Sequence, residues 1–129
     1  MGRAEVDVDI DRPADSVWQV VRDFGGLARW MPGIDSCTVD GDTRTLSVMG
    51  TEVVERHLGT DDTERSTRYS IVGGGIPVTH HEATVSVAER GPDACHVSWA
   101  FEVEPEPLVP LLTQSYQAAL QALASGAGS

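Results

Sequence analysis

The chain has 129 residues, a formal net charge of −11 and no lysine, so that all nine basic residues are arginines. A strongly acidic chain is repelled by nucleic-acid backbones and by anionic membrane surfaces, so we expect neither as a partner. The absence of lysine excludes every mechanism that needs a lysine Schiff base or a lysine acid–base group.

Length and cysteine content predict one cytoplasmic domain. We expect a single domain over residues 1–129, with a flexible tail from about residue 125. Cys37 and Cys95 lie far apart without C-x-x-C spacing, which is typical of two buried thiols in a reducing cytosol. No stretch has about 18 consecutive apolar residues, and the first residues lack the apolar run of a signal peptide. We expect a monomer or a homodimer.

The amino-terminal part predicts one strand and two short helices. Glu5–Ile10 alternates acidic and β-branched residues, as a half-buried strand does. The segment that begins at Asp11 is typical of a helix start, with Asp11 as a candidate cap and a proline in the first turn. We expect Gly25-Gly26 to end this helix and Leu27–Met31 to form the second helical piece.

The rest of the chain predicts a sheet and one long helix. Turns rich in Gly, Asp and Pro separate six expected strands: Ile34–Val39, Arg44–Met49, Glu52–Leu58, Arg65–Val72, Val78–Glu89 and Ala94–Val103. Leu108–Ala124 has an apolar stripe at helical spacing. We therefore predict an α+β fold, in which a curved seven-stranded antiparallel sheet wraps around the long C-terminal helix. Such a fold can enclose a chamber for a small apolar ligand.

Strand alternation predicts which side chains face this chamber. In Ala94–Val103 the inward set includes Trp99 and Phe101, and in Val78–Glu89 it includes His81, so that His80 points outward. Tyr69 and Ile71 share the apolar face of their strand. Glu52–Leu58 stays ambiguous, because one parity places Val54, Arg56 and Leu58 inward and the other places Val53, Glu55 and His57 inward. Hydrophobicity slightly favours the first parity.

The chain resembles the START-like (Bet v 1-like, SRPBCC) superfamily, in particular its polyketide cyclase/dehydrase branch and the plant abscisic-acid receptors. The resemblance covers nearly the whole chain. It is carried by these residues: Arg12-Pro13-Ala14-Asp15-Ser16-Val17-Trp18, Asp23-Phe24, Leu27-Ala28-Arg29-Trp30-Met31-Pro32, Val54-Glu55-Arg56, Asp61-Asp62, Tyr69-Ser70-Ile71-Val72-Gly73-Gly74 and Val97-Ser98-Trp99. It implies the helix-grip fold, in a superfamily that holds enzymes, carriers and receptors.

The resemblance also implies roles for particular residues. In the receptor branch the glutamate that matches Glu55 lines the chamber, which favours the second parity of Glu52–Leu58. The loop that matches Gly73–Pro77 closes over the chamber as a flap, whose residues are Gly73, Gly74, Gly75 and Pro77. The receptor lysine that grips a ligand carboxylate is replaced by Asp35, and the loop at Met49-Gly50-Thr51 is shorter than the receptor gate. Both differences argue against a carboxylate ligand and against a hormone-receptor role.

The candidate catalytic residues are His81, Glu55, Tyr69 and His57, which should converge from three strands. A carboxylate desolvated there would have a raised pKa and an imidazole a lowered one, and both shifts favour acid–base catalysis. Our hypothesis makes His81 the base, Glu55 a second acid–base or orienting group and Tyr69 a hydrogen-bond donor. The candidate ligand-binding residues are Val53, Ile71, Ile76, Ala83, Trp99, Phe101, Trp30, Leu112 and Tyr116.

These residues predict a cofactor-independent protein that binds a small hydrophobic, non-anionic molecule. A cyclase or dehydratase acting on a polyketide-like substrate is one interpretation, and a non-catalytic carrier with the same chamber is the other. A metal site is not expected, because Glu55, His57 and His81 lie without a diagnostic ligand spacing. A protein-interaction module that uses the long helix is a third, weaker interpretation.

Overall fold

The computed structural model describes residues 1–126. One sheet contains seven strands: β1 (Gly2–Ile10), β2 (Ile34–Asp40), β3 (Thr43–Val48), β4 (Thr51–Asp61), β5 (Ser66–Gly74), β6 (His80–Glu89) and β7 (Cys95–Glu104). The helices are α1 (Ala14–Val21), the 3₁₀ helices η1 (Phe24–Arg29) and η2 (Glu106–Leu108), and α2 (Val109–Ala124).

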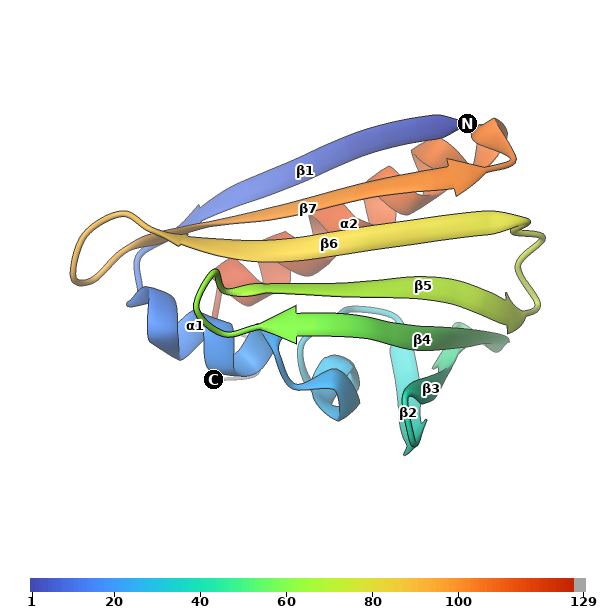
Figure 1. The fold of residues 1–129 in the computed structure, drawn as a ribbon, viewed down its shortest axis with the longest axis horizontal. Coiled ribbons are helices and arrows are strands. Elements are labelled where there is room, and N and C mark those ends of the chain that lie inside the picture. The colour runs from blue at the N-terminus through green and yellow to red at the C-terminus, as the bar shows by residue number, and fades with distance from the viewer. Residues whose placement is uncertain (127–129) are drawn as a thin grey trace.

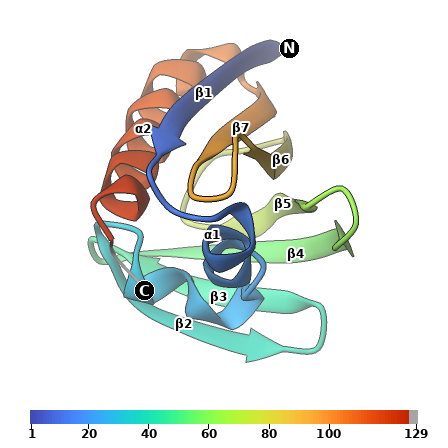
Figure 2. The same ribbon diagram turned by 90° about the vertical axis from the view of Figure 1, so that its left-hand side faces the viewer.

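The sheet order is β1-β7-β6-β5-β4-β3-β2, and every neighbouring pair is antiparallel. Consecutive hairpins produce the run from β2 to β7, and β1 completes the sheet beside β7 (Figure 1). The sheet curves from β1 round to β2, with α2 along its concave side (Figure 2). The predicted α+β architecture is confirmed. None of the described helices is long and apolar enough to span a membrane.

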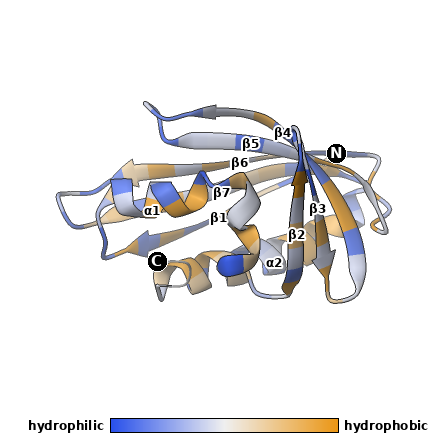
Figure 3. Cartoon of the chain, turned by 90° about the horizontal axis from the view of Figure 1, so that it is seen from below, coloured by the Kyte–Doolittle hydropathy of each residue, from blue (hydrophilic) through white to orange (hydrophobic). Residues whose placement is uncertain are grey.

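Alternation along the strands places the core between sheet and helix. The strands and α2 carry the hydrophobic segments, whereas the β6–β7 turn is hydrophilic (Figure 3). The predicted inward residues of β7, from Cys95 to Val103, are buried, as are Tyr69 and Ile71 on β5. His81 is 1% exposed while the neighbouring His80 is exposed, so the predicted orientation of the two histidines is confirmed.

The ambiguous strand follows the parity that the family resemblance favours. On β4, Val53 and Glu55 are buried, whereas Arg56 and Leu58 are exposed. The preference drawn from hydrophobicity is therefore wrong. The strand pairing shifts register between His57 and Gly59, and period-two alternation weakens beyond such an irregularity.

The helix boundaries differ from the prediction. Asp11 is not the cap of α1, because Pro13 is the N-cap residue and no side chain caps the helix. The helix ends at Val21, and Gly25-Gly26 lies inside η1 rather than after α1. A Cβ at Gly26 would lie 2.5 Å from a carboxylate oxygen of Asp23, so this glycine permits close packing within η1.

The β5–β6 connection lies two residues later in the chain than predicted. Gly73 and Gly74 belong to β5 and pair with β4, so the loop comprises residues 75–79. Gly74 has a φ of +105°, and a Cβ there would lie 2.3 Å from the carbonyl oxygen of Glu52. The N–H of Gly75 donates to the same oxygen at 2.7 Å. The start of the loop is thus held tightly against β4.

Three further predictions concern the cysteines, the start of the long helix and the C-terminal tail. Cys95 is buried and Cys37 is half-buried, and both thiols are free. The helical segment expected from Leu108 starts as a separate 3₁₀ turn before α2. Of the expected tail, residues 125 and 126 form a turn after α2, and residues 127–129 lie outside the described part of the chain.

Candidate active site

A cavity of about 60 Å³ lies between the sheet, η1 and α2. Its wall is mostly apolar and includes Leu27 of η1, Val53 of β4 and Leu112 of α2. The polar side chains of the wall are Glu55, Tyr69, Ser115 and Tyr116. A drug-sized ligand needs a pocket of about 300–1,000 Å³, so this cavity suits a much smaller molecule.

A buried ion pair lies at one side of the cavity. Arg44 of β3 and Glu55 of β4 are directly opposite each other across the two strands, and they are 6% and 5% exposed. Arg44 Nε donates to Glu55 Oε1 at 2.8 Å, and its terminal nitrogen Nη2 lies 2.7 Å from the same oxygen. Removing either partner leaves an uncompensated charge in a dry environment, which is strongly destabilising.

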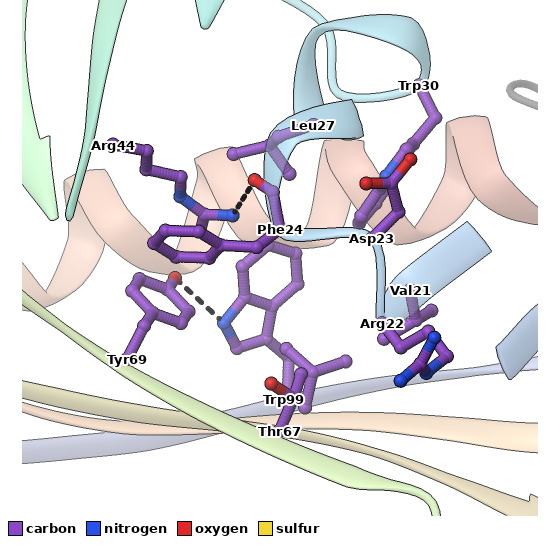
Figure 4. Close-up of a pocket in the computed structure, with 11 residues that line it drawn as sticks. Val21, Arg22, Asp23, Phe24, Leu27, Trp30, Arg44, Thr67, Tyr69 and Trp99 are labelled. Carbon is purple, nitrogen blue, oxygen red and sulfur yellow. Dashed lines mark hydrogen bonds between the residues drawn. The ribbon is translucent and has the colours of Figure 1, made fainter. Parts of the chain in front are cut away.

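The guanidinium of Arg44 is fixed on its other side as well. Its Nη1 donates to the carbonyl oxygen of Phe24 at 2.9 Å, and its central carbon lies 4.3 Å from the centre of the Phe24 ring. Tyr69 provides a second aromatic ring, 5.1 Å from the same carbon. Figure 4 shows the Arg44 side chain beside Phe24 and Tyr69 in a second, smaller cavity of about 20 Å³. Arg44 is therefore a rigid partner for the carboxylate.

The ion pair leaves one carboxylate oxygen unused. Both contacts from Arg44 fall on Oε1, and no residue within 1–126 donates a hydrogen bond to Oε2 of Glu55. Burial raises the pKa of Glu55, while the charge and the hydrogen bond of Arg44 oppose that rise. The result is a desolvated carboxylate in the cavity wall with one oxygen available as a proton acceptor.

Two phenol hydroxyls lie in the same wall. Trp99 Nε1 donates to the Tyr69 oxygen at 3.2 Å, and His81 Nε2 lies 3.0 Å from the Tyr116 oxygen. The Tyr116 ring also stacks on the Trp99 ring, with centroids 4.1 Å apart. Burial raises the pKa of both phenols well above the ordinary value, so both are protonated at neutral pH and can donate hydrogen bonds.

His81 lies behind this wall and not in it. The β5–β6 ladder ends at the pair Tyr69 and Ala83, so the N–H of Ile71 has no ladder partner on β6. That N–H donates instead to Nδ1 of His81 at 3.0 Å. Burial lowers the pKa of His81 to about 4, which keeps the ring neutral at physiological pH. Both ring nitrogens therefore have protein partners.

The structure distributes the other predicted ligand-binding residues over three places. Val53, Ile71, Ile76, Leu112 and Tyr116 line the 60 Å³ cavity. Trp30 and Trp99 line the smaller cavity. Ala83 and Phe101 are buried in the core and belong to neither wall, although Phe101 packs edge-on against Tyr116 at 5.2 Å.

Among the predicted catalytic residues, Glu55 and Tyr69 share the cavity wall, and His81 reaches it through Tyr116. His57 lies apart from them. It is half-exposed, its Nε2 lies 2.7 Å from the Thr60 hydroxyl, and its ring packs against Phe24. Nowhere in residues 1–126 do three His, Cys, Asp or Glu side chains come close enough to hold a metal ion.

Arg44 is the residue that sequence reasoning missed. Arginine is usually exposed, and Arg44 is the first residue of the predicted strand Arg44–Met49, for which the sequence predicts no site role. Two signals could have identified it. Arg44 shares the parity of Leu46, which is buried. In addition, an inward-facing glutamate needs a nearby cation, and Arg44 lies on a strand next to that of Glu55.

Comparison with known proteins confirms the resemblance seen in the sequence. The chain belongs to the family described as polyketide cyclase/dehydrase and lipid transport, whose pattern matches residues 1–128. A comparison with curated proteins finds no match.

Solved structures with the same fold include proteins of different names. XoxI from Bacillus cereus is 28% identical, with a TM-score of 0.92 over 97% of this chain and 94% of its own. The di-domain ARO/CYC protein BexL of the BE-7585A biosynthetic pathway is 18% identical, with a TM-score of 0.81 over 97% of this chain and 46% of its own. Norcoclaurine synthase from Thalictrum flavum is 22% identical, with a TM-score of 0.77 over 95% and 84%. The last two likenesses concern the fold alone.

Proposed function

We propose that the chain binds a small, mostly apolar, uncharged molecule in the 60 Å³ cavity and catalyses acid–base cyclisation or dehydration of a short polyketide-like substrate. The observation that carries this proposal is the desolvated Glu55 carboxylate, whose Oε2 is available in an apolar wall. The family and the ARO/CYC neighbour support a role of this kind. An anionic ligand is disfavoured, because it would meet the negative charge of Glu55.

In the proposed reaction Glu55 Oε2 removes a proton from the carbon next to a substrate carbonyl. The electron pair of the broken C–H bond moves onto the carbonyl oxygen, and a phenol of Tyr69 or Tyr116 stabilises the resulting enolate by donating a hydrogen bond. The enolate carbon then attacks a second carbonyl of the same substrate. Glu55 returns its proton to the new alkoxide, so no external oxidant, reductant or cofactor is consumed.

Arg44 serves this reaction by holding Glu55 in its charged form. Burial alone would favour the protonated acid, which cannot accept a proton. The guanidinium opposes that shift and leaves Oε2 without a protein donor. Since one oxygen is fixed by Arg44 and the other is available, the carboxylate is both oriented and reactive.

Ethyl acetoacetate is a suitable probe, because it is small, uncharged and has the acidic methylene group of a β-keto chain. In D₂O, proton NMR follows the exchange of this group for deuterium. We expect the wild type to accelerate exchange and Glu55→Gln to lose about 10²-fold or more of the acceleration. Glu52→Gln is the matched control, because Glu52 is exposed on the same strand. Equal rates for wild type and Glu55→Gln would refute the catalytic role.

Glu55→Gln leaves the Arg44 charge unpaired, so the double variant Arg44→Met/Glu55→Gln is measured beside it to separate loss of chemistry from loss of folding.

A second candidate function is supported by the size of the cavity and by the engagement of half the carboxylate by Arg44. A wild type that binds the ester without accelerating exchange would be a carrier that uses Glu55 only to accept a ligand hydrogen bond.

A further inference from the structure

His81 is buried, lies next to the candidate active site and does not line it. It contacts the site through a single hydrogen bond to the hydroxyl of Tyr116. Its other ring nitrogen contacts the main chain of β5. These two contacts determine which nitrogen of the ring carries the proton.

The main-chain partner fixes the tautomer. A peptide N–H can only donate, so Nδ1 of His81 must be the unprotonated nitrogen that accepts from Ile71. A neutral imidazole then has its proton on Nε2. This N–H faces the Tyr116 oxygen at 3.0 Å, so the ring donates and the phenol oxygen accepts. The phenol proton of Tyr116 must therefore point away from His81.

The hydroxyl oxygen of Tyr69 likewise accepts a hydrogen bond from a buried side chain. The indole of Trp99 can only donate, so the Tyr69 oxygen is the acceptor of that bond and its own proton also needs another partner. Besides these bonds from His81 and Trp99, neither phenol oxygen has a hydrogen-bond partner among the described residues. Each phenol proton thus lacks an acceptor within residues 1–126, and both phenols line the cavity.

We propose that His81 is a positioning residue that orients Tyr116, so that the Tyr116 hydroxyl donates to an acceptor oxygen of the ligand. The inference rests on the proposed function in so far as the ligand occupies this cavity. It narrows the ligand class to compounds with a carbonyl or a similar acceptor oxygen at the tyrosine side of the cavity. It also replaces the role of base that the sequence suggested for His81, because neither ring nitrogen is available to a substrate proton.

The test uses amide side chains that imitate one ring nitrogen each. In His81→Gln the amide nitrogen can take the place of Nε2 and donate to Tyr116. In His81→Asn the side chain reaches only the Nδ1 position and cannot contact Tyr116. Tyr116→Phe removes the hydroxyl itself, and His80→Asn is the matched control, because His80 is the exposed neighbour. Each variant is assayed for exchange of ethyl acetoacetate, for its Kd by NMR titration, and for retained fold by circular dichroism.

We expect Tyr116→Phe to lower the exchange rate by about 10²-fold and His81→Asn by about tenfold. His81→Gln should exceed His81→Asn in rate and in affinity, and His81→Asn should add little to Tyr116→Phe in the double variant. Nitrogen-15 NMR of the wild type should show an unprotonated Nδ1 and a protonated Nε2 for His81. If His81 only fills space, both amide variants will show equal rates, which would overturn the inference.

The inference and the proposed function can fail separately. If exchange is catalysed but His81 carries its proton on Nδ1, or if His81→Asn matches the wild type, the inference is overturned and the function stands. If the wild type binds the ester without exchange, the catalytic function fails, and a weaker affinity in His81→Asn than in His81→Gln still supports the inference. If the ester does not bind, the proposed function fails, and the nitrogen-15 signals of His81 alone test the inference. A protonated Nδ1 would then overturn the assigned tautomer and with it the inference.

Discussion

Arg44→Met should cost about 3–5 kcal/mol of unfolding free energy, because it leaves the Glu55 carboxylate buried without its counter-charge. The structure supports the upper part of the range. Both side chains are less than 10% exposed, the contact distances are 2.7 and 2.8 Å, and the substitution also removes the bond to the Phe24 carbonyl. A domain of ordinary stability has about 5–15 kcal/mol in total, so the loss is a large fraction of it.

Urea denaturation measures this loss directly. With an m-value of about 2 kcal/mol/M, a loss of 4 kcal/mol lowers the transition midpoint by about 2 M. Arg56→Met is the matched control, because Arg56 lies on the adjacent strand in an exposed ion pair with Asp42, and it should cost about 0.5 kcal/mol or less. The double variant Arg44→Met/Glu55→Gln should be more stable than Arg44→Met alone. A loss below about 1 kcal/mol for Arg44→Met at an unchanged m-value would refute the reasoning that the pair is dry.

Two further predictions concern pH and backbone geometry. The pKa of His81 falls from 6.5 to about 4 on folding, so unfolding takes up a proton between these values and stability falls as pH is lowered through this window, by about 3 kcal/mol at pH 4. Urea titrations at pH 7 and pH 4 should show this component in wild type and His80→Asn but not in His81→Gln, and an equal pH dependence in all three would contradict it. Gly74→Ala should cost about 2 kcal/mol or more in the same assay, because its φ is positive and its Cβ would contact the Glu52 carbonyl. Gly73→Ala, whose Cβ would meet only Val54 at 3.7 Å, should cost less, and equal losses would contradict the geometric argument.

The arrangement of the strands could be read from the sequence because alternation repeats over long strands. On β7 five inward residues share one parity, so a register error there would expose the whole set. On β4 the same method failed, because the inward face includes Glu55 and the outward face includes Leu58. A comparison of the two faces by hydrophobicity disfavours an inward carboxylate, although Arg44 on the neighbouring strand compensates the charge of Glu55.

The side-chain contacts of the site could not be predicted from the sequence, because they depend on how the strands pair. His57 shares the parity of Glu55, but its ring packs against Phe24 and does not line the cavity. His81 accepts from Ile71 only because the β5–β6 ladder stops at Tyr69. Neither the Phe24–His57 contact nor the end of this ladder changes the alternation of residue types, so no pattern in the chain indicates them. The resemblance to a family supplied the inward orientation of Glu55, which the residues alone left open.

The proposed assignments together imply how the cavity would select its ligand. The wall offers the carboxylate acceptor of Glu55, the phenol donor of Tyr116 and otherwise mostly apolar surface. A hydrocarbon of the right size would leave both polar groups desolvated and unpaired, at a cost of about 1–3 kcal/mol for each group. An anion would accept from the phenol, but Glu55 Oε2 has no hydrogen to donate, and the anion would lose its hydration in a mostly apolar wall. An uncharged carbonyl compound with an acidic hydrogen satisfies both groups at once. Selectivity then arises mainly from the free-energy penalty of binding an unsuitable ligand. In a cavity of about 60 Å³, this penalty discriminates only among molecules short enough to reach both groups.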